Sequence, residues 1–351
     1  MGAIDCMGAP NGPQTPKCSG RPGTAVAPLD TRARTIAAVA LTHGGVVGCG
    51  ALSSGLGRGR RIELSAAAKV NLALEVLGRR ADGYHEIVTV MQAVELSDRI
   101  VLEDVEPLEL RTTAPGIPTD GSNLALRAAL MLREAAGVQR GVRITLDKRI
   151  PVAAGLGGGS TDAAAVLLGL NRLWRLRWPL DRVAEVAVLL GMDVPFFLRG
   201  GAAFGTGRGE KLDRMPGMAM ALVLANPRYP SSTAEAYGRL TPGMYSDGGR
   251  ARAVATALSA RRVERVAGNL YNGLEAAVAP AHPEIGQMKA ALLAAGALGA
   301  LMSGSGPTVF GVARSLDHAR QIQRRVQRAS WECWAVRTLA GPAVRRRDRR
   351  T

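Results

Sequence analysis

The stretch PVAAGLGGGSTDAAA, residues 151–165, decides the fold of this chain. Four glycines fall within residues 155–159, and an apolar helix is expected directly after them, from about Ser160 to Trp174. Glycine lets the backbone approach a ligand closely and adopt positive φ angles. The first turn of a helix presents unpaired N–H groups and the positive end of its dipole, which together attract phosphates. The sequence therefore predicts a phosphate-binding loop, to which the hydroxyls of Ser160 and Thr161 add donors.

Other phosphate-binding loops fit this stretch less well. A P-loop has lysine after its last glycine, whereas Ser160 follows Gly159 here. The dinucleotide-binding fingerprint has a third glycine at the position that Ser160 occupies. The HRD and DFG elements of protein kinases are missing from the chain. A glycine-rich turn before a capped helix, without any ligand, remains the alternative.

Strands and helices alternate irregularly on both sides of this loop. The hydrophobic pattern predicts strands at 62–65, 70–76, 142–146, 221–225 and, as a pair, 299–313, and helices at 123–136, 180–190, 250–260, 264–278, 283–295 and 316–328. A connection rich in Met, Pro and Gly at 212–220 suggests a domain boundary. We therefore expect an α+β protein with two domains, 62–215 and 216–340, in place of a doubly wound sheet.

Composition and charge narrow the possible functions. The formal net charge is +16, but residues 1–61 contribute +5 and the run from Arg345 to Arg350 contributes +4. Because the basic residues gather at the two ends, we do not expect nucleic acid as the main partner, although an S5-like RNA-binding protein remains an alternative. The four cysteines form no CxxC pair, so neither a zinc site nor a disulfide framework is indicated, and a reducing, cytoplasmic location is expected. No stretch approaches the ~20 apolar residues that span a bilayer.

The two ends of the chain read differently from the rest. Residues 1–61 are rich in Gly, Pro, Ala, Ser and Thr and have no sustained period, which predicts a disordered extension or a start codon assigned too far upstream. A transit peptide and an export signal are the alternatives. Residues 341–351 are expected to form a basic, disordered tail.

Five ordered segments carry a resemblance to a known family. The segments AAAKVNLAL at 66–74, PVAAGLGGGSTDAAA at 151–165 and LMSGSGPTVFG at 301–311 resemble the three motifs of the galactokinase, homoserine kinase, mevalonate kinase and phosphomevalonate kinase superfamily. The segments GRRADGYHE at 78–86 and GMDVPFFLRGG at 191–201 look like those of the 4-diphosphocytidyl-2-C-methyl-D-erythritol kinase family, of the non-mevalonate isoprenoid route. The resemblance covers roughly residues 62–340.

This resemblance implies a fold and a reaction. The fold would be an N-terminal domain like ribosomal protein S5 domain 2 and a ferredoxin-like C-terminal domain, with the active site between them. ATP, carrying Mg²⁺, would phosphorylate the 2-hydroxyl of the methylerythritol moiety. We expect this small molecule as the partner, no nucleic acid or membrane, and a monomer or weak homodimer. A sister kinase acting on homoserine or mevalonate is the alternative.

The catalytic residues implied by the resemblance are Lys69 and Asp193. Asp193 follows a helix and precedes an apolar run, where a merely solvated charge is poorly placed, although Asp also favours turns and caps. Asp193 would accept the proton of the attacking hydroxyl. Lys69 would stabilise charge on the transferred oxygens. A snorkelling role is the alternative for Lys69, because its stretch is otherwise apolar.

The binding residues implied by the resemblance complete the site. Asn71 lies two residues after Lys69, faces the same side of the strand and would contact the substrate. Tyr84 and His85 match the cytosine pocket, and Tyr237 matches the aromatic residue on the other face of the base. The loop at 303–308 would close over phosphates or substrate, and Gly273 replaces the acid of the related Asn-Asp-Leu-Glu segment. No cluster of carboxylates marks a protein metal site. The ATP-binding residues would be Pro151, Val152, Ala153, Ala154, Gly155, Leu156, Gly157, Gly158, Gly159, Ser160 and Thr161.

Overall fold

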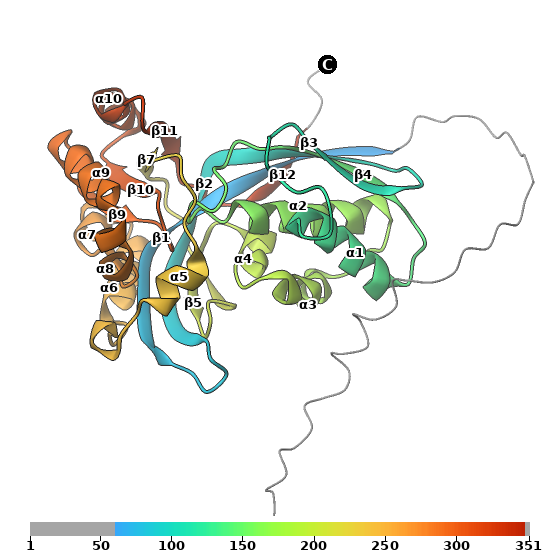
Figure 1. Ribbon diagram of the computed structural model, residues 1–351, viewed down its shortest axis with the longest axis horizontal. Helices are drawn as coiled ribbons and strands as arrows, with labels where there is room; N and C mark the ends of the chain where they lie inside the picture. The colour runs from blue at the N-terminus through green and yellow to red at the C-terminus, as the bar shows by residue number, and fades with distance from the viewer. Residues whose placement is uncertain (1–59, 348–351) are drawn as a thin grey trace, which may run out of the picture. The chain divides into compact units, whose positions relative to one another are not determined.

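Two long antiparallel strands form the centre of the fold (Figure 1). The computed structural model describes residues 60–347, so the expectations for residues 1–59 lie outside the described residues. Strands β1 (Arg61–Arg79) and β2 (His85–Glu103) pair from Arg61 opposite Glu103 to Arg79 opposite His85. The sequence predicted two short strands in place of β1. The difference arises because irregularities at Ala67/Lys69 and Asn71/Ala73 bend one continuous ladder, as β-bulges do.

One mixed sheet forms around this pair, mostly from the first half of the described chain. Its order is β12-β1-β2-β4-β3, with β5 on β2, β6 on β5 and β8 on β1. The remaining strands are β3 (Leu108–Thr112), β4 (Val142–Asp147), β5 (Ala202–Thr206), β6 (Lys211–Met215), β8 (Tyr271–Asn272) and β12 (Val344–Arg346). The helices of this half are α1 (Leu124–Ala136), α2 (Gly158–Leu173), α3 (Leu180–Leu190) and α4 (Val194–Arg199).

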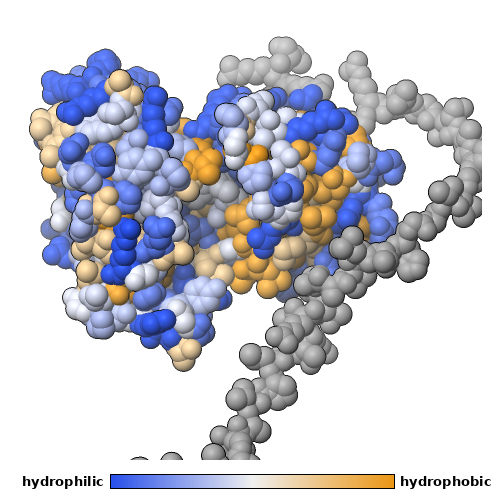
Figure 2. Space-filling model, in the orientation of Figure 1, coloured by the Kyte–Doolittle hydropathy of each residue, from blue (hydrophilic) through white to orange (hydrophobic). Residues whose placement is uncertain are grey.

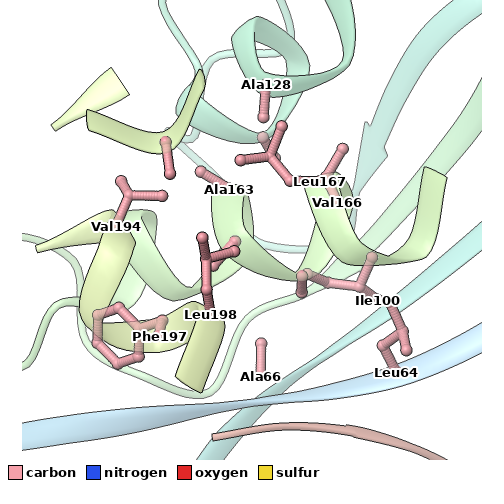
Figure 3. Packing of buried hydrophobic residues seen from close by; sticks show 14 of the residues in the cluster. Leu64, Ala66, Ile100, Ala128, Ala163, Val166, Leu167, Val194, Phe197 and Leu198 are labelled. Carbon is pink, nitrogen blue, oxygen red and sulfur yellow. The ribbon is translucent and has the colours of Figure 1, made fainter. Parts of the chain in front are cut away.

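Helix α2 is the centre of the first hydrophobic core. Figure 3 shows Ala163, Val166 and Leu167 of α2 between strand residues such as Ile100 and the α4 residues Phe197 and Leu198. Gly169 allows α2 to approach the sheet, because a Cβ there would lie 2.3 Å from a methyl carbon of Leu102. This packing fixes where α2 begins, and therefore where the glycine-rich loop lies.

The second half of the chain forms an antiparallel sheet with the order β11-β7-β10-β9. Helices α9 and α10 pack on this sheet, and the chain order β7, α9, β9, β10, α10, β11 is the split βαβ pattern of ferredoxin-like domains. The elements are β7 (Ala221–Asn226), α5 (Thr233–Gly238), η3 (Pro242–Met244), α6 (Gly249–Ser259), α7 (Val263–Gly268), α8 (Glu275–Val278), η4 (Ala279–Ala281), α9 (Pro283–Ala294), β9 (Gly299–Met302), β10 (Val309–Ala313), α10 (Leu316–Val326) and β11 (Glu332–Arg337).

Two sequence-based expectations are wrong in detail. The helix expected at 264–278 is divided, because the amide of Gly273 donates to the carbonyl of Leu74 and so joins β1 instead of continuing a helix. The disordered tail expected from residue 341 is ordered as far as residue 347, since β12 pairs with β1 at Leu64–Ala66. Residues 348–351 lie outside the described residues.

The two halves of the fold can also be distinguished at the molecular surface. Figure 2 shows a recess between them on one face and an apolar region over the helices of the first half. Residues 60–347 belong to one compact unit of the chain. Strands β8 and β12 come from the later part of the sequence and complete the first sheet. Within this described range, no helix combines the length and the apolar character needed to cross a membrane.

Candidate active site

A cavity of about 1400 Å³ lies where the two halves meet. Residues from all three predicted motifs line it, including Lys69 of β1, Gly157 at the start of α2 and Ser305 of the loop after β9. Asp193 lines the same cavity, as do Tyr84, His85 and Tyr237. The structure therefore brings together residues that are separated by up to 236 positions in the sequence.

Lys69 and Asp193 form an ion pair at the base of this cavity. The Lys69 Nζ lies 3.3 Å from Asp193 Oδ2, and Lys69 is only 4% exposed. Asp193 is the N-cap residue of α4 but makes no capping hydrogen bond through its side chain. Lys69 does not snorkel to the surface. Its ammonium is directed into the cavity, beside a carboxylate that remains partly accessible.

Asn71 holds the ammonium of Lys69 in place. Lys69 Nζ donates to Asn71 Oδ1 at 2.6 Å, and Asn71 Nδ2 donates to Thr89 Oγ1 of β2 at 2.8 Å. The irregularities of β1 on either side of these residues aim both side chains toward the loop. The sequence predicted that Lys69 and Asn71 share a face but gave no sign of Thr89, which lies on the neighbouring strand and meets Asn71 only through a side-chain hydrogen bond across the sheet.

The glycine-rich loop is fastened to the strand that carries Lys69. The amide of Lys69 donates to the carbonyl of Leu156 at 3.0 Å. Gly157 has a φ of +70° and precedes α2, whose first turn contains no acidic residue and no side-chain cap. A Cβ at Gly157 would lie 2.7 Å from the ring of Phe197, so the loop requires glycine here. The amides of the first turn of α2 therefore face the cavity without competition from a side chain.

The predicted ATP-binding residues divide into two groups. Ala153, Ala154, Gly155 and the residues from Gly157 to Ser160 line the cavity. Pro151, Val152, Leu156 and Thr161 do not line it. Thr161 is fully buried, and its hydroxyl has no hydrogen-bond partner within the described residues. Thr161 therefore does not line the cavity in this structure, and its predicted contact with the phosphates stays a prediction.

The third motif packs against the glycine loop from the other half of the molecule. Ser303 Oγ donates to the carbonyl of Gly155 at 2.9 Å, and the amide of Ser231 donates to the carbonyl of Ala153 at 2.8 Å. Asn272 supports the turn by donating to the carbonyls of Met302 and Gly304. Ser231 and Asn272 were not predicted, because their partners are backbone carbonyls that no sequence pattern reveals. Gly273, where the family acid is replaced, contributes its amide to β1 and does not line the cavity.

A cluster of aromatic residues also lines the cavity. The rings of His85 and Tyr237 lie 5.3 Å apart, and Tyr245 meets His85 edge-on at 6.2 Å. Tyr84 is 55% exposed, and the Arg208 guanidinium lies 4.9 Å from the centre of its ring. Tyr245 and Arg208 were missed, because neither lies in a recognisable motif. The cluster offers flat faces and hydrogen-bonding edges to a planar ligand.

Electrostatic effects in this cluster favour neutral rings. Burial and the nearby charge of Arg79 lower the pKa of His85 below its ordinary value, so its imidazole is neutral at pH 7. Burial, reinforced by the Asp193 carboxylate, raises the pKa of Tyr237 well above its ordinary value, so its phenol keeps its proton. A neutral imidazole both donates and accepts hydrogen bonds, which suits the edge of a base.

A metal site of protein ligands is not formed in this region. Within residues 60–347, no group of three or more His, Cys, Asp or Glu side chains is arranged to hold a metal ion.

Comparisons with known proteins agree with this geometry. Residues 123–201 match the GHMP kinases N terminal domain, and residues 254–333 match the GHMP kinases C terminal family. The chain is 45% identical over 277 residues to the 4-diphosphocytidyl-2-C-methyl-D-erythritol kinase of Pelotomaculum thermopropionicum, covering 78% of this chain and 96% of that one. It is 46% identical over 282 residues to the kinase of the same name from Symbiobacterium thermophilum, covering 79% of this chain and all of that one.

Solved structures support the same assignment. A crystal structure of 4-(cytidine 5'-diphospho)-2C-methyl-D-erythritol kinase superposes with a TM-score of 0.68 and 39% identity, covering 79% of this chain and 99% of that one. Homoserine kinase from Cytophaga hutchinsonii, at a TM-score of 0.65 and 20% identity over 85% of this chain and 100% of that one, shares the fold. The predicted α+β, two-domain organisation is thus confirmed. The chain belongs to the 4-diphosphocytidyl-2-C-methyl-D-erythritol kinase family of GHMP kinases.

Proposed function

We propose that this protein transfers the γ-phosphoryl group of ATP to the 2-hydroxyl of 4-diphosphocytidyl-2-C-methyl-D-erythritol. One observation carries the proposal: the Lys69–Asp193 pair lies in the same cavity as the first turn of α2 and the aromatic cluster around His85. The cavity thus offers backbone amides to a polyphosphate, aromatic rings to a planar base, and a carboxylate with an ammonium to the reacting groups. Phosphoryl transfer depends mainly on this kind of alignment and on charge neutralisation.

The triphosphate would be bound by backbone amides. Gly157, Gly158, Gly159 and Ser160 line the cavity at the open end of α2, where the helix dipole favours anions. Mg²⁺ would arrive with ATP and neutralise part of the phosphate charge, held by phosphate oxygens and water. The carbonyls of Ala153 and Gly155 are bonded to Ser231 and Ser303, which keeps them from turning toward the phosphates.

The catalytic step would use Asp193 and Lys69. Asp193 accepts the proton of the acceptor hydroxyl as that oxygen attacks the γ-phosphorus, and the bond to the ADP oxygen breaks. Lys69, fixed by Asn71, stabilises the negative charge on the transferred oxygens. General-base catalysis of this type contributes about 10²–10⁴ in rate.

The acceptor would be selected through its cytosine ring. Tyr84 and Tyr237 provide aromatic faces, and the neutral imidazole of His85 contacts the edge of the base. Stacking of a base on an aromatic side chain is worth about 1–3 kcal/mol. An acceptor without a base, such as homoserine or mevalonate, leaves this region empty and gains none of that energy.

An acceptor panel tests the proposal. The full chain is incubated with ATP, Mg²⁺ and, separately, the cytidylyl acceptor, homoserine or mevalonate, and both ADP and the phosphorylated product are measured. We expect kcat/KM for the cytidylyl acceptor to exceed the other two by at least about tenfold, the energy of one stacked base. A preference for homoserine or mevalonate, or ADP release without a phosphorylated acceptor, would contradict the proposal.

A further inference from the structure

Three buried ionisable side chains lie beside the glycine loop and outside the lining of the cavity. They are Asp98 of β2, Lys148 after β4 and Asp162 of α2, and none of them lines the cavity. Asp98 and Asp162 are 1% and 3% exposed, and the side chain of Lys148 is 7% exposed. Lys148 Nζ donates to Asp162 Oδ2 at 2.9 Å and also to Asp98 Oδ2. The proposed catalytic mechanism uses none of these groups.

The contacts join both ends of the glycine loop to the sheet. Lys148 lies just before the loop and Asp162 just after it, so a single ammonium holds the two ends together. Asp98 Oδ1 also accepts hydrogen bonds from the amides of Arg149 and Ile150, at 2.6 and 2.9 Å. These contacts therefore fix the path of the glycine loop between its two ends.

This cluster also lies close to the proposed phosphate site. The Lys148 Nζ is 3.0 Å from the position that a Cβ on Gly158 would occupy, and Gly158 is the first residue of α2 and lines the cavity. Because the intervening space is protein and not water, a change of charge in the cluster is weakly screened there.

The charges of the cluster balance only if one carboxyl group keeps a proton. Two buried carboxylates beside one ammonium would leave a net negative charge, which is costly in the interior. Asp162 Oδ1 has no hydrogen-bond partner within residues 60–347, whereas both oxygens of Asp98 are bonded. Burial raises the pKa of Asp162 to about 8; Lys148 opposes this rise and Asp98 adds to it. These two are the charged groups acting on Asp162 from the described elements around it.

We propose that Asp98, Lys148 and a protonated Asp162 form a neutral clasp beside the glycine loop, in which Asp162 is a positioning residue for the nucleotide. While Asp162 keeps its proton, the loop presents its amides and the dipole of α2 to the phosphates without a nearby buried anion. Loss of that proton places an uncompensated carboxylate beside Gly158, which repels the triphosphate. The proposal rests on the proposed function in one respect, namely that ATP binds at this loop.

Direct binding measurements across pH test the clasp. The full chain, Asp162→Asn and the matched control Asp181→Asn are titrated with a non-hydrolysable ATP analogue and Mg²⁺ by calorimetry from pH 6.5 to 9.5. Asp181 is an exposed acid on α3 (side chain 87% exposed). Because the pKa of Asp162 is raised, affinity is full below about pH 8 and is lost above it. We expect wild type and Asp181→Asn to lose up to about tenfold per pH unit above that value.

At pH 7 the affinity of Asp162→Asn for the analogue should equal that of wild type, and at pH 9 it should not fall as the wild-type affinity does. Any titration of the analogue itself affects the measured affinities of all three proteins equally. The clasp is wrong if Asp162→Asn loses affinity in parallel with wild type, or if wild type shows no loss. Absence of analogue binding at every pH would instead contradict the proposed nucleotide site.

A second measurement on the ligand-free wild type does not depend on nucleotide binding or on the folding of a variant. The ¹³Cγ resonances of aspartate-labelled protein should show one carboxyl that titrates near pH 8. If every aspartate of the folded protein is already ionised at pH 6, the clasp is ruled out.

Discussion

Tyr84 is the residue that most directly reports how the base would be bound. Its ring is exposed at the cavity while Arg208 lies against it, so it is available to a ligand and not committed to the core. Replacing Tyr84 by Ala should raise KM for the cytidylyl acceptor by about 5–150-fold, the equivalent of 1–3 kcal/mol of stacking. KM for ATP should stay the same, since Tyr84 is not among the residues of the glycine loop that would bind the phosphates. Steady-state kinetics with each substrate varied in turn measures both values.

Tyr84→Phe is the matched control, because it keeps the aromatic face and removes only the hydroxyl. It should retain a KM near that of wild type. An unchanged acceptor KM in Tyr84→Ala, or equal losses in the two variants, would show that the ring does not stack on the base.

Residues that the sequence motifs singled out lie together in the structure, while their roles in catalysis and binding stay predictions. Lys69 and Asp193 are brought within 3.3 Å of each other, and Asn71 shares the face of Lys69. The clasp was not predicted, because Asp98 lies 50 residues before Lys148 and their contact exists only after the sheet has formed. The burial of Thr161 was not predicted either, since a hydroxyl at the start of a helix faces the surface or the interior according to packing that the sequence does not display.

Helix α2 and the loop before it form the element on which the site depends. Gly155 has a φ of +74°, and a Cβ there would lie 2.0 Å from the carbonyl oxygen of Ser303. Gly155→Ala should therefore lower the free energy of unfolding by at least about 1–2 kcal/mol from backbone strain alone. It should also weaken ATP binding, because the third motif must move away from the loop. Urea unfolding and nucleotide titration measure the two effects.

Gly159→Ala is the control within the same element. Gly159 lies in the first turn of α2, and a Cβ there would make only an ordinary contact with Leu124, at 3.4 Å. Alanine is favoured over glycine in helices by about 1 kcal/mol, so this variant should be at least as stable as wild type. Equal stability of the Gly155 and Gly159 variants would refute the proposed close contact between the loop and the third motif.

Helices were predicted correctly where the hydrophobic period and the capping residues indicated the same bounds. The helix expected at 180–190 is α3, and the helix expected at 123–136 begins after Asn123, whose side chain caps it, and ends before Gly137 in the left-handed conformation. The uninterrupted β1 was not predicted, because bulges disturb the alternation of its side chains. The short strand β8 was missed because two residues carry no period; it is defined by its pairing with Ala73 and Leu74.

At the scale of the whole molecule, the sequence indicated the fold class and the order of its two parts. It did not indicate that the end of the chain returns to the first sheet. The basic run after residue 344 looks like a solvated tail, yet β12 pairs with β1 and Arg347 contacts Glu63 at 3.2 Å. Edge strands of this kind are specified by backbone hydrogen bonds to a distant partner, which composition does not reveal.

Both halves of the fold are needed for the proposed active site, because each contributes residues to the same cavity. Lys69, Asp193 and the glycine loop come from the first half, and the third motif and Tyr237 come from the second. The central claim is that this enclosure lets Asp193 take a proton from an acceptor hydroxyl while Lys69 stabilises the transferred group. The most direct test is the single-turnover rate of phosphoryl transfer at saturating ATP and acceptor. Asp193→Asn should slow transfer by about 10²–10⁴ without weakening acceptor binding. A folded Asp193→Asn protein that transfers at the wild-type rate would contradict the account.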